Sequence, residues 1–447
     1  MHKEFIRIDD VTVNNNELLV KLSFSDRVKE YFKGDHLRIT YDQNIENVSK
    51  SVLSIPAFAA VVTIAWGSGA DIYLETIDSC FLESLKSVEQ VFREWFPRFS
   101  FSTEIHADHI VAPDGPAGKR YALLFSGGLD SLTSYLRHRE EKPTLITVHG
   151  SDIPLTEQRY WNLVKTKLQN FANQESLTIH FITTNERELI NDNLAAKNFL
   201  GKAGGSWYGD VTHGLCLATA GAPLLTPEYG TLLVASSEFK QPKNPRALGF
   251  QGSLLFHFAD VSIGNTRIVY DSSELTRMEK VKQILKPESH YASNLIVCSS
   301  TERFFAPSPQ FLNCCVCEKC LRTIAELALQ NIDPATCNFS LRKTEDALNL
   351  IKTRFRFGAM ASEWSVLENW KDIQDITEEN IGSGIKGARE FFRWFKTVNL
   401  NRITRTPISV LNDRLPILYC YSSISTRHQG IRHIIGFLYW TLRTKHN

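Results

Sequence analysis

The sequence predicts an α/β protein built on a doubly wound parallel sheet. First, short apolar strands alternate with amphipathic helices between residues 119 and 345. Second, the apolar strand 121–125 runs through a Ser-Gly-Gly turn directly into a helix. Third, 447 residues, 43% of them hydrophobic, suffice for a large core and for roughly two to four domains. Strands linked by helices at this spacing form parallel sheets that are covered on both faces.

The chain divides into three segments that differ in composition and in predicted secondary structure. Residues 1–112 are expected to form a small α+β domain, with strands at 5–13, 18–24 and 71–75 and a helix from Asp78 or Ser79 to Pro97. Residues 113–118 are rich in Pro and Gly and are expected to be a linker. Residues 119–345 carry the doubly wound sheet, and 346–447 are expected to be a mostly helical, basic extension.

The sheet segment contains five predicted strands and four predicted helices. The strands are 121–125, 144–149, 178–183, 231–235 and 295–298, and the helices are 131–139, 158–172, 211–225 and 277–285. Ligands of doubly wound sheets bind at the carboxyl ends of the strands. Glu238, just beyond the strand 231–235, is therefore a candidate for binding substrate or Mg²⁺. Arg277 and Lys280 lie one helical turn apart and could face one anion, although a solvated helix face explains them equally well.

Charge is unevenly distributed along the chain. The net charge is +1, yet the residues from Lys386 to the end hold eleven Lys or Arg and only two acidic residues. Such a tail suits a nucleic-acid or protein docking surface, but a basic helical face packed on the acidic remainder is the favoured interpretation. The charged amino-terminal residues and the absence of a long apolar run predict a cytoplasmic protein with no membrane contact.

The most informative motif is Ser126-Gly127-Gly128-Leu129-Asp130-Ser131. Glycines allow a tight turn and a close approach of the backbone to a ligand, and the following helix start favours an anion. Asp130 would repel a bare phosphate, so its presence indicates Mg²⁺ held against phosphates. The motif is neither a Walker A loop nor GxGxxG. An ordinary turn with a chance Asp is the competing interpretation.

Five of the nine cysteines lie between Cys298 and Cys320. Cys298, Cys314, Cys317 and Cys320 could close a tetrahedral, structural Zn²⁺ site. A [4Fe–4S] cluster and a CxxC redox pair are the competing interpretations. Cys315 is expected to be a buried or free thiol, with exchange into the ligand set left open.

Together the loop and the cysteines resemble the PP-loop ATP pyrophosphatases of the HUP-like fold, and within them the QueC-like (7-cyano-7-deazaguanine synthase-like) family. The resemblance covers roughly residues 121–323, and the segments 270–280 and 313–323 look most like divergent members from the Qat and CBASS antiphage systems. One departure is Cys315, where a Gly is usual in that family. The resemblance implies that residues 126–131 bind the pyrophosphate of ATP. Asp130 and Ser131 are the catalytic candidates of this loop, and Arg277 and Lys280, from their helical spacing, are further catalytic candidates. The resemblance also places His149 and Gly150 beside the adenosine.

The resemblance further implies a ligase that adenylates 7-carboxy-7-deazaguanine with ATP and Mg²⁺. An amine, such as the amino terminus of a partner protein, would then attack to give an amide. Three alternatives stay open: a queuosine-pathway nitrile synthase that uses ammonia, a PP-loop enzyme that modifies tRNA, and a non-enzymatic scaffold. The basic carboxyl-terminal segment keeps nucleic acid among the candidate partners.

Overall fold

The computed structural model describes most of the chain. The described residues are 3–201, 206–225, 227–237, 254–298, 312–339, 341, 343–356, 364–377 and 384–400. They form two compact units, 1–274 and 275–447, and each unit is described by itself below. Glu238 and the basic segment beyond residue 400 lie outside the described residues.

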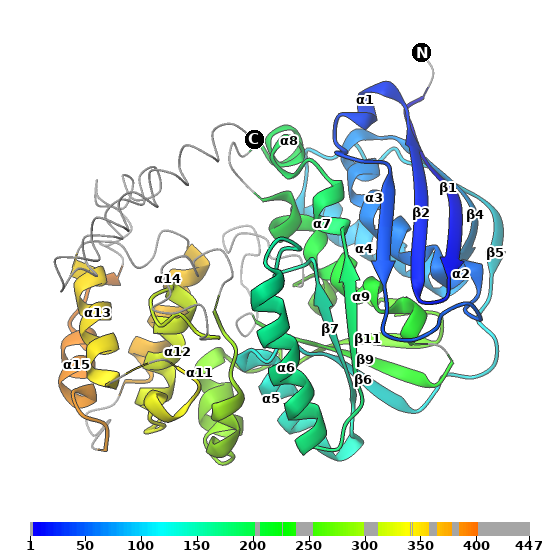
Figure 1. The fold of residues 1–447 in the computed structure, drawn as a ribbon. Coiled ribbons are helices and arrows are strands. Elements are labelled where there is room, and N and C mark those ends of the chain that lie inside the picture. The colour runs from blue at the N-terminus through cyan, green and yellow to red at the C-terminus, as the bar shows by residue number, and fades with distance from the viewer. Residues whose placement is uncertain are drawn as a thin grey trace. The chain divides into compact units, whose positions relative to one another are not determined.

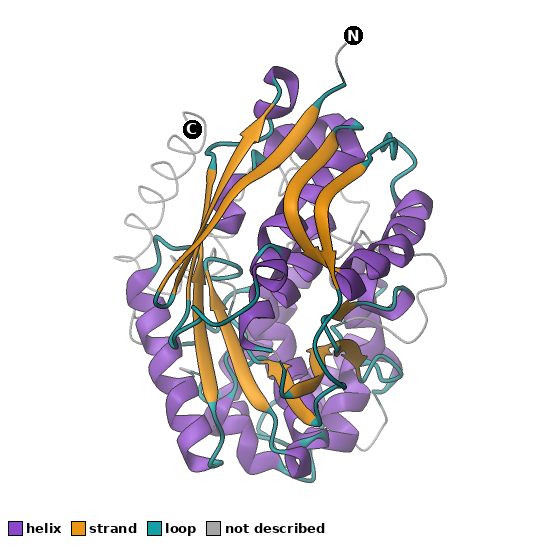
Figure 2. Ribbon diagram, turned by 90° about the vertical axis from the view of Figure 1, so that its right-hand side faces the viewer, coloured by secondary structure: helices purple, strands orange, loops and turns teal. Residues whose placement is uncertain are grey.

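The first unit is an α/β structure built on one large, mostly parallel sheet of eleven strands (Figures 1 and 2). The order across the sheet is β10-β11-β9-β6-β7-β8-β3-β2-β1-β4-β5. The strands are β1 Phe5–Asn14, β2 Glu17–Phe24, β3 His36–Thr40, β4 Asp71–Asp78, β5 Ile105–Val111, β6 Arg120–Leu124, β7 Thr144–His149, β8 Ile179–Thr184, β9 Tyr229–Ala235, β10 Ser262–Ile263 and β11 Thr266–Asp271.

Two parallel blocks make up this sheet. The strands β11, β9, β6, β7 and β8 pair in parallel, and so do β1, β4 and β5. Antiparallel pairs β1–β2, β2–β3 and β3–β8 connect the blocks. The segments 1–112 and 119–345, expected to be separate domains, therefore contribute strands to a single sheet.

Helices of the first unit pack on this sheet around one apolar core. They are α1 Asp26–Lys29, α2 Lys50–Leu53, α3 Ile55–Ser68, α4 Ser79–Trp95, α5 Leu129–Arg137, α6 Gln158–Gln174, α7 Glu186–Leu189, α8 Asp192–Ala195, α9 His213–Ala220 and α10 Leu255–Phe258. The helix α3 contacts β1 and β4, α5 contacts β6 and β9, and α6 contacts β8. The helix α4 starts as expected, because the Asp78 carboxylate accepts a hydrogen bond from the Phe81 amide at 2.8 Å.

The second unit is helical in its described residues. Its helices are α11 Arg277–Lys280, which continues as a π-helical turn Val281–Leu285, α12 Glu318–Leu329, α13 Thr344–Arg356, α14 Trp364–Asp375 and α15 Ala388–Lys396. Their aromatic side chains form the core: the Trp370 ring lies 5.0 Å from Phe355 and 5.7 Å from Phe395 between centroids. The expected strand 295–298 is wrong, since this segment is irregular.

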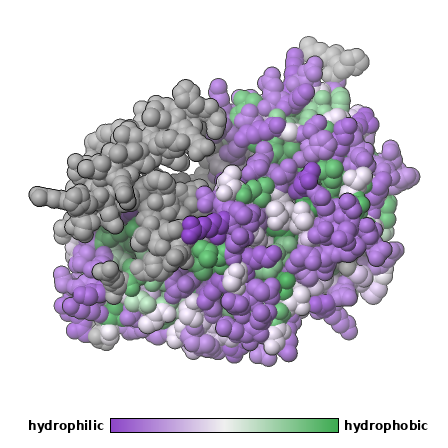
Figure 3. All heavy atoms as spheres, in the orientation of Figure 1, coloured by the Kyte–Doolittle hydropathy of each residue, from purple (hydrophilic) through white to green (hydrophobic). Residues whose placement is uncertain are grey.

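The visible surface gives little sign of a large apolar patch. On the face drawn in Figure 3, the described residues at the surface are mostly hydrophilic, with hydrophobic ones scattered among them. Among the described residues, no helix is both long and apolar enough to cross a membrane.

Candidate functional site

The Ser-Gly-Gly loop lies at the switch point of the first unit's sheet. It follows β6, which pairs with β7 on one side and with β9 on the other, both in parallel. The chain proceeds from β6 to β7 and β8 in one direction and later adds β9 and β11 in the other. Crevices at the carboxyl ends of strands beside such a reversal are where open α/β sheets bind ligands. The loop thus occupies the position that the fold makes available for a ligand.

The backbone of this loop turns sharply before the helix α5. Gly127 has a φ of 73°, in the left-handed region that favours glycine, and Gly128 is the residue immediately before the helix. The Ser126 hydroxyl accepts from the Gly128 amide at 3.3 Å, and the Ser131 hydroxyl donates to the Gly128 carbonyl at 3.2 Å. These contacts hold the loop folded over the first turn of α5.

The start of α5 is suited to an anion. Within the described residues, no side chain caps this helix end, and first-turn amides have no partner inside their own helix. Ser126 is exposed and Gly128 and Asp130 are half-buried, while the apolar side chain of Leu129 is buried in the core. Ser126, Gly128 and Asp130 can therefore meet a ligand, whereas Leu129 can contribute only its backbone. The Asp130 carboxylate is a ligand type that Mg²⁺ prefers.

Two side chains that we did not single out from the sequence fix the other end of α5. Asp271, the last residue of β11, accepts a hydrogen bond from the Ser134 hydroxyl at 2.6 Å. Its second oxygen lies 3.0 Å from the His138 ring, and this pairing raises the pKa of His138. Asp271 could have been singled out from the sequence, because it is an acidic residue at the carboxyl end of a strand.

His149 ends β7, the strand next to β6, and Gly150 directly follows it. The His149 ring stacks on Trp161 with centroids 4.6 Å apart and planes 3° apart, and burial lowers its pKa. Gly150 has a φ of 95°, and a Cβ there would lie 1.7 Å from the Thr184 carbonyl oxygen. Both residues thus have packing roles in the sheet, and their contact with an adenosine stays a prediction.

The second unit contains the predicted cysteine cluster. Cys298, Cys314, Cys317 and Cys320 each offer a sulfur, and these four atoms all lie within 4.8 Å of one another. Cys317 caps α12, since its sulfur accepts from the Cys320 amide at 3.3 Å, and the Cys314 sulfur accepts from the Cys317 amide at 3.2 Å. Four convergent, mostly buried sulfurs could hold a zinc ion with no position left for a substrate.

Asn313 holds the two parts of this cluster together, and sequence reasoning missed it. Its amide group donates to the Leu295 carbonyl at 2.9 Å and to the Asn338 carbonyl at 3.0 Å, and its oxygen accepts from the Val297 amide at 2.8 Å. The segment bearing Cys298 is thereby tied to the CxxCxxC turn. No spacing rule singles out an asparagine that acts through backbone groups.

Cys315 lies beside this cluster but outside its ligand set. Its φ is 60°, in the left-handed region, and its sulfur contacts the Asn313 carbonyl at 3.6 Å. A glycine would adopt that conformation without the steric strain that a Cβ atom brings.

Arg277 and Lys280 also belong to the second unit. The Arg277 guanidinium contacts both oxygens of the buried Glu326 carboxylate, at 3.0 and 3.1 Å, and donates to the Thr323 hydroxyl at 3.1 Å. Lys280 is fully buried. Neither side chain therefore lies on a solvated helix face. Contact of either side chain with a substrate anion stays a prediction.

No protein-family model, curated protein or solved structure matches this chain.

Proposed function

We propose that this protein is an ATP-dependent ligase that activates a carboxylate as its adenylate, with AMP and pyrophosphate as products. The observation that supports it is the Ser126–Ser131 loop at the switch point of a parallel sheet, leading into the first turn of α5. The left-handed Gly127 lets the backbone turn sharply before α5, and Asp130 places a carboxylate suited to Mg²⁺ at a helix start suited to phosphate.

The residues of the loop suit a nucleotide triphosphate with its metal. Backbone amides at the start of α5 and the Ser126 hydroxyl would bind phosphate oxygens, and Asp130 would hold Mg²⁺. Mg²⁺ would supply neutralising charge for the departing pyrophosphate. The protein's remaining task is to hold the acid close to the α-phosphate, since positioning converts a bimolecular step into an intramolecular one.

For the substrate we propose 7-carboxy-7-deazaguanine, on the family resemblance of the loop and the four cysteines. We propose further that an amine of a partner protein attacks the adenylate and leaves a stable amide, in an antiphage system. A four-cysteine zinc site, which Cys298, Cys314, Cys317 and Cys320 could form, would then serve stability and not chemistry.

ATP–pyrophosphate exchange in the presence of 7-carboxy-7-deazaguanine tests the adenylation. The wild-type protein should exchange label only when the acid is present. Asp130→Asn should lower the exchange rate roughly 100-fold or more, as loss of one electrostatic contact to developing charge does. Asp108→Asn, at an exposed carboxylate of β5, is the matched control and should exchange at the wild-type rate. Equal exchange by the Asp130 variant at ordinary Mg²⁺ would refute the role of Asp130.

The amide product is tested separately by intact-mass spectrometry of candidate partner proteins. Incubation with ATP and the acid should add the mass of the deazaguanine acyl group to one partner. Efficient formation of free 7-cyano-7-deazaguanine from ammonia, without labelling of any protein, would favour the nitrile synthase instead.

A further inference from the structure

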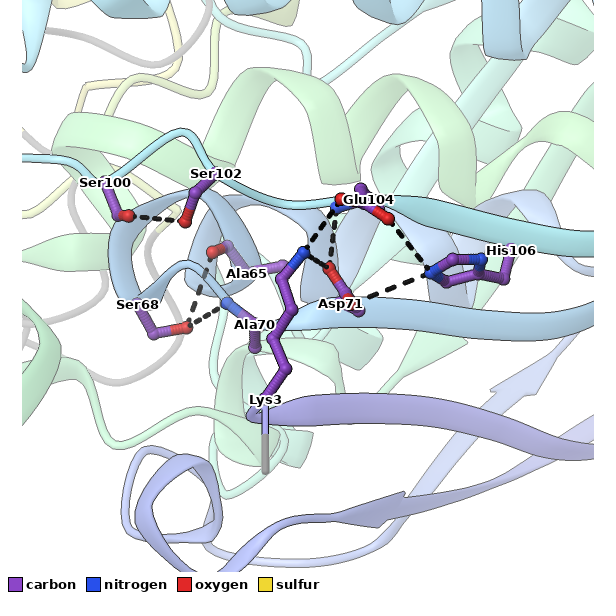
Figure 4. Close-up of polar contacts among 9 residues, drawn as sticks. All are labelled: Lys3, Ala65, Ser68, Ala70, Asp71, Ser100, Ser102, Glu104 and His106. Atoms are coloured by element: carbon purple, nitrogen blue, oxygen red, sulfur yellow. Dashed lines mark hydrogen bonds and ion pairs between the residues drawn. The ribbon is translucent and has the colours of Figure 1, made fainter. Parts of the chain in front are cut away.

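A second cluster of metal-ligating side chains lies at the starting ends of β4 and β5, which are six and seven strands from β6 in the sheet (Figure 4). Asp71 begins β4, Glu104 directly precedes β5, and His106 is the second residue of β5. Parallel pairing of the two strands brings these residues together, because Ile72 is in register with Ile105. One ligand atom from each lies within 4.8 Å of the other two.

The two carboxylates divide their oxygens between two partners. The Lys3 ammonium lies 2.7 Å from Asp71 Oδ1 and 3.2 Å from Glu104 Oε1. The His106 Nε2 atom lies 3.7 Å from Asp71 Oδ2 and 3.8 Å from Glu104 Oε2. Lys3 thus takes one oxygen of each carboxylate, and the remaining two face the imidazole nitrogen (Figure 4).

The contacts of His106 are too long for hydrogen bonds and of the right size for a metal site. Hydrogen bonds between these atom types measure about 2.7–3.2 Å. Ligand atoms bonded at about 2.1 Å to a tetrahedral zinc lie roughly 3.4 Å from one another. The two distances to His106 Nε2, 3.7 and 3.8 Å, exceed that separation by only a few tenths of an ångström.

Neighbouring residues hold this triangle in place. The His106 ring stacks on Tyr73, with centroids 4.6 Å apart and planes 14° apart. Asp71 accepts the Glu104 amide at 2.8 Å. Burial raises the pKa of Asp71, but the Lys3 ammonium and this amide outweigh it, so the net pKa is lowered. Preorganised ligands whose other atoms are hydrogen-bonded are typical of metal centres.

We infer that Asp71, Glu104 and His106 form a second site for a divalent transition-metal ion such as Zn²⁺. The ion binds Asp71 Oδ2, Glu104 Oε2 and His106 Nε2. Two carboxylates against one ammonium leave a net negative charge that favours a cation, and the mixed nitrogen and oxygen set suits zinc. The exposed side chains of Glu104 and His106 leave the remaining coordination position open to solvent. This site does not depend on the proposed adenylation.

The test is the zinc content of the full-length protein after equilibrium dialysis against micromolar free Zn²⁺, measured by elemental analysis. The wild type should bind one more zinc per chain than His106→Ala or Glu104→Gln. The matched control is His109→Ala, at an exposed histidine of the same strand, and it should bind as much as the wild type. Because the cysteine cluster is intact in all four proteins, its zinc cancels in the comparison.

The melting temperature with and without Zn²⁺ is a second measurement, and it separates loss of the metal site from misfolding of the variant. Zn²⁺ should raise the melting temperature of His106→Ala less than that of the wild type, because a ligand of the folded state stabilises it. Equal zinc content in wild type and His106→Ala would overturn the site and leave the cluster as an ion-pair network. Equal loss of zinc in His109→Ala would overturn it as well.

Discussion

A buried carboxyl group shows at the residue scale how strongly the interior of the first unit perturbs its polar side chains. Glu186, at the start of α7, is 6% exposed and is hydrogen-bonded to the Cys216 thiol. Within the described part of the chain, its Oε1 atom has no hydrogen-bond partner. Burial raises the pKa of Glu186 from 4.5 to about 7, against the opposing effects of Cys216, His213 and Arg187. The folded protein therefore keeps a proton that the unfolded chain has released.

We predict that this proton makes the first unit less stable as pH rises. Between pH 4.5 and about 7 the folded state binds more protons at Glu186 than the unfolded state, so the free energy of unfolding falls with pH. At about 1.4 kcal/mol per pKa unit, the loss amounts to about 3 kcal/mol once the pH exceeds 7.

Glu186→Gln should remove this dependence, since an amide does not titrate. Chemical denaturation at pH 5 and pH 8 measures it, with Glu188→Gln, an exposed carboxyl on the same helix, as the control. If the Gln variant loses stability with pH as steeply as the wild type, Glu186 ionises normally.

At the scale of elements, the side chain of Asn185 completes the junction between the two blocks of the sheet. The strands β3 and β8 pair through only two residue pairs, Ile39–Thr184 and Thr40–Thr183. Beyond one end of this pairing, the Asn185 side chain accepts from the Arg38 amide at 2.8 Å and donates to the His36 carbonyl at 3.0 Å. The Asn185 side chain thus adds two hydrogen bonds to the one backbone bond found there, from the Asn185 amide to the Arg38 carbonyl at 3.3 Å.

We predict that Asn185→Ala weakens this junction locally. Two lost hydrogen bonds should cost roughly 1–3 kcal/mol, because each contributes about 0.5–1.5 kcal/mol net. Hydrogen exchange of the β3 and β8 amides should accelerate accordingly, whereas Asn193→Ala, at an exposed position, should leave it unchanged. An unaltered exchange rate in Asn185→Ala would show that the backbone pairs alone hold the blocks together.

Hydrophobic periodicity predicted several of the regular elements correctly. It failed at a helix that is buried on all sides and at a segment whose backbone bonds to a side chain. The strand 144–149 has the expected bounds, and α4 and α6 were each placed to within two residues. The helix α3 was missed because all but its last residue is buried, so it lacks a polar face. The apolar segment 295–298 looked like a strand, but the Asn313 side chain takes up its backbone groups.

The candidate sites also differ in whether a local sequence pattern reveals them. A contiguous motif such as the Ser126–Ser131 loop, and cysteines at short spacing, are visible in the sequence. The Asp71 cluster is not, since Glu104 and His106 follow more than thirty residues later and only strand pairing joins them. Its geometry follows from the fold and not from any local pattern.

For the whole molecule, the two units have cores of different kinds. The first unit is organised by one continuous sheet, whereas the described part of the second is a set of helices. In the second unit, the Cys298 sulfur lies among the cysteine sulfurs at the start of α12. The Asn313 side chain also binds the segment that precedes Cys298. A metal bound there would contribute free energy of folding to the second unit directly.

We predict that removing this metal unfolds part of the second unit and spares the first. Hydrogen exchange of the full-length protein, with and without a strong zinc chelator, measures it. Amides of α12 and α13 should lose at least about 3 kcal/mol of protection, roughly 100-fold in rate, because structural zinc supplies that much or more. Amides of β6, β7 and β9 should keep theirs, since, within the described residues, the strands of the first unit's sheet pair only with one another.

Cys317→Ser should reproduce the effect of the chelator, because it removes a sulfur ligand while its hydroxyl can still cap α12. Cys80→Ser, at a half-buried cysteine of the first unit, is the matched control and should leave α12 unaffected. Elemental analysis of the wild type should find zinc, and iron with labile sulfide would instead establish a cluster. If the exchange of the α12 amides does not change after chelation, the four cysteines stabilise the second unit by packing as thiols and not by binding a metal.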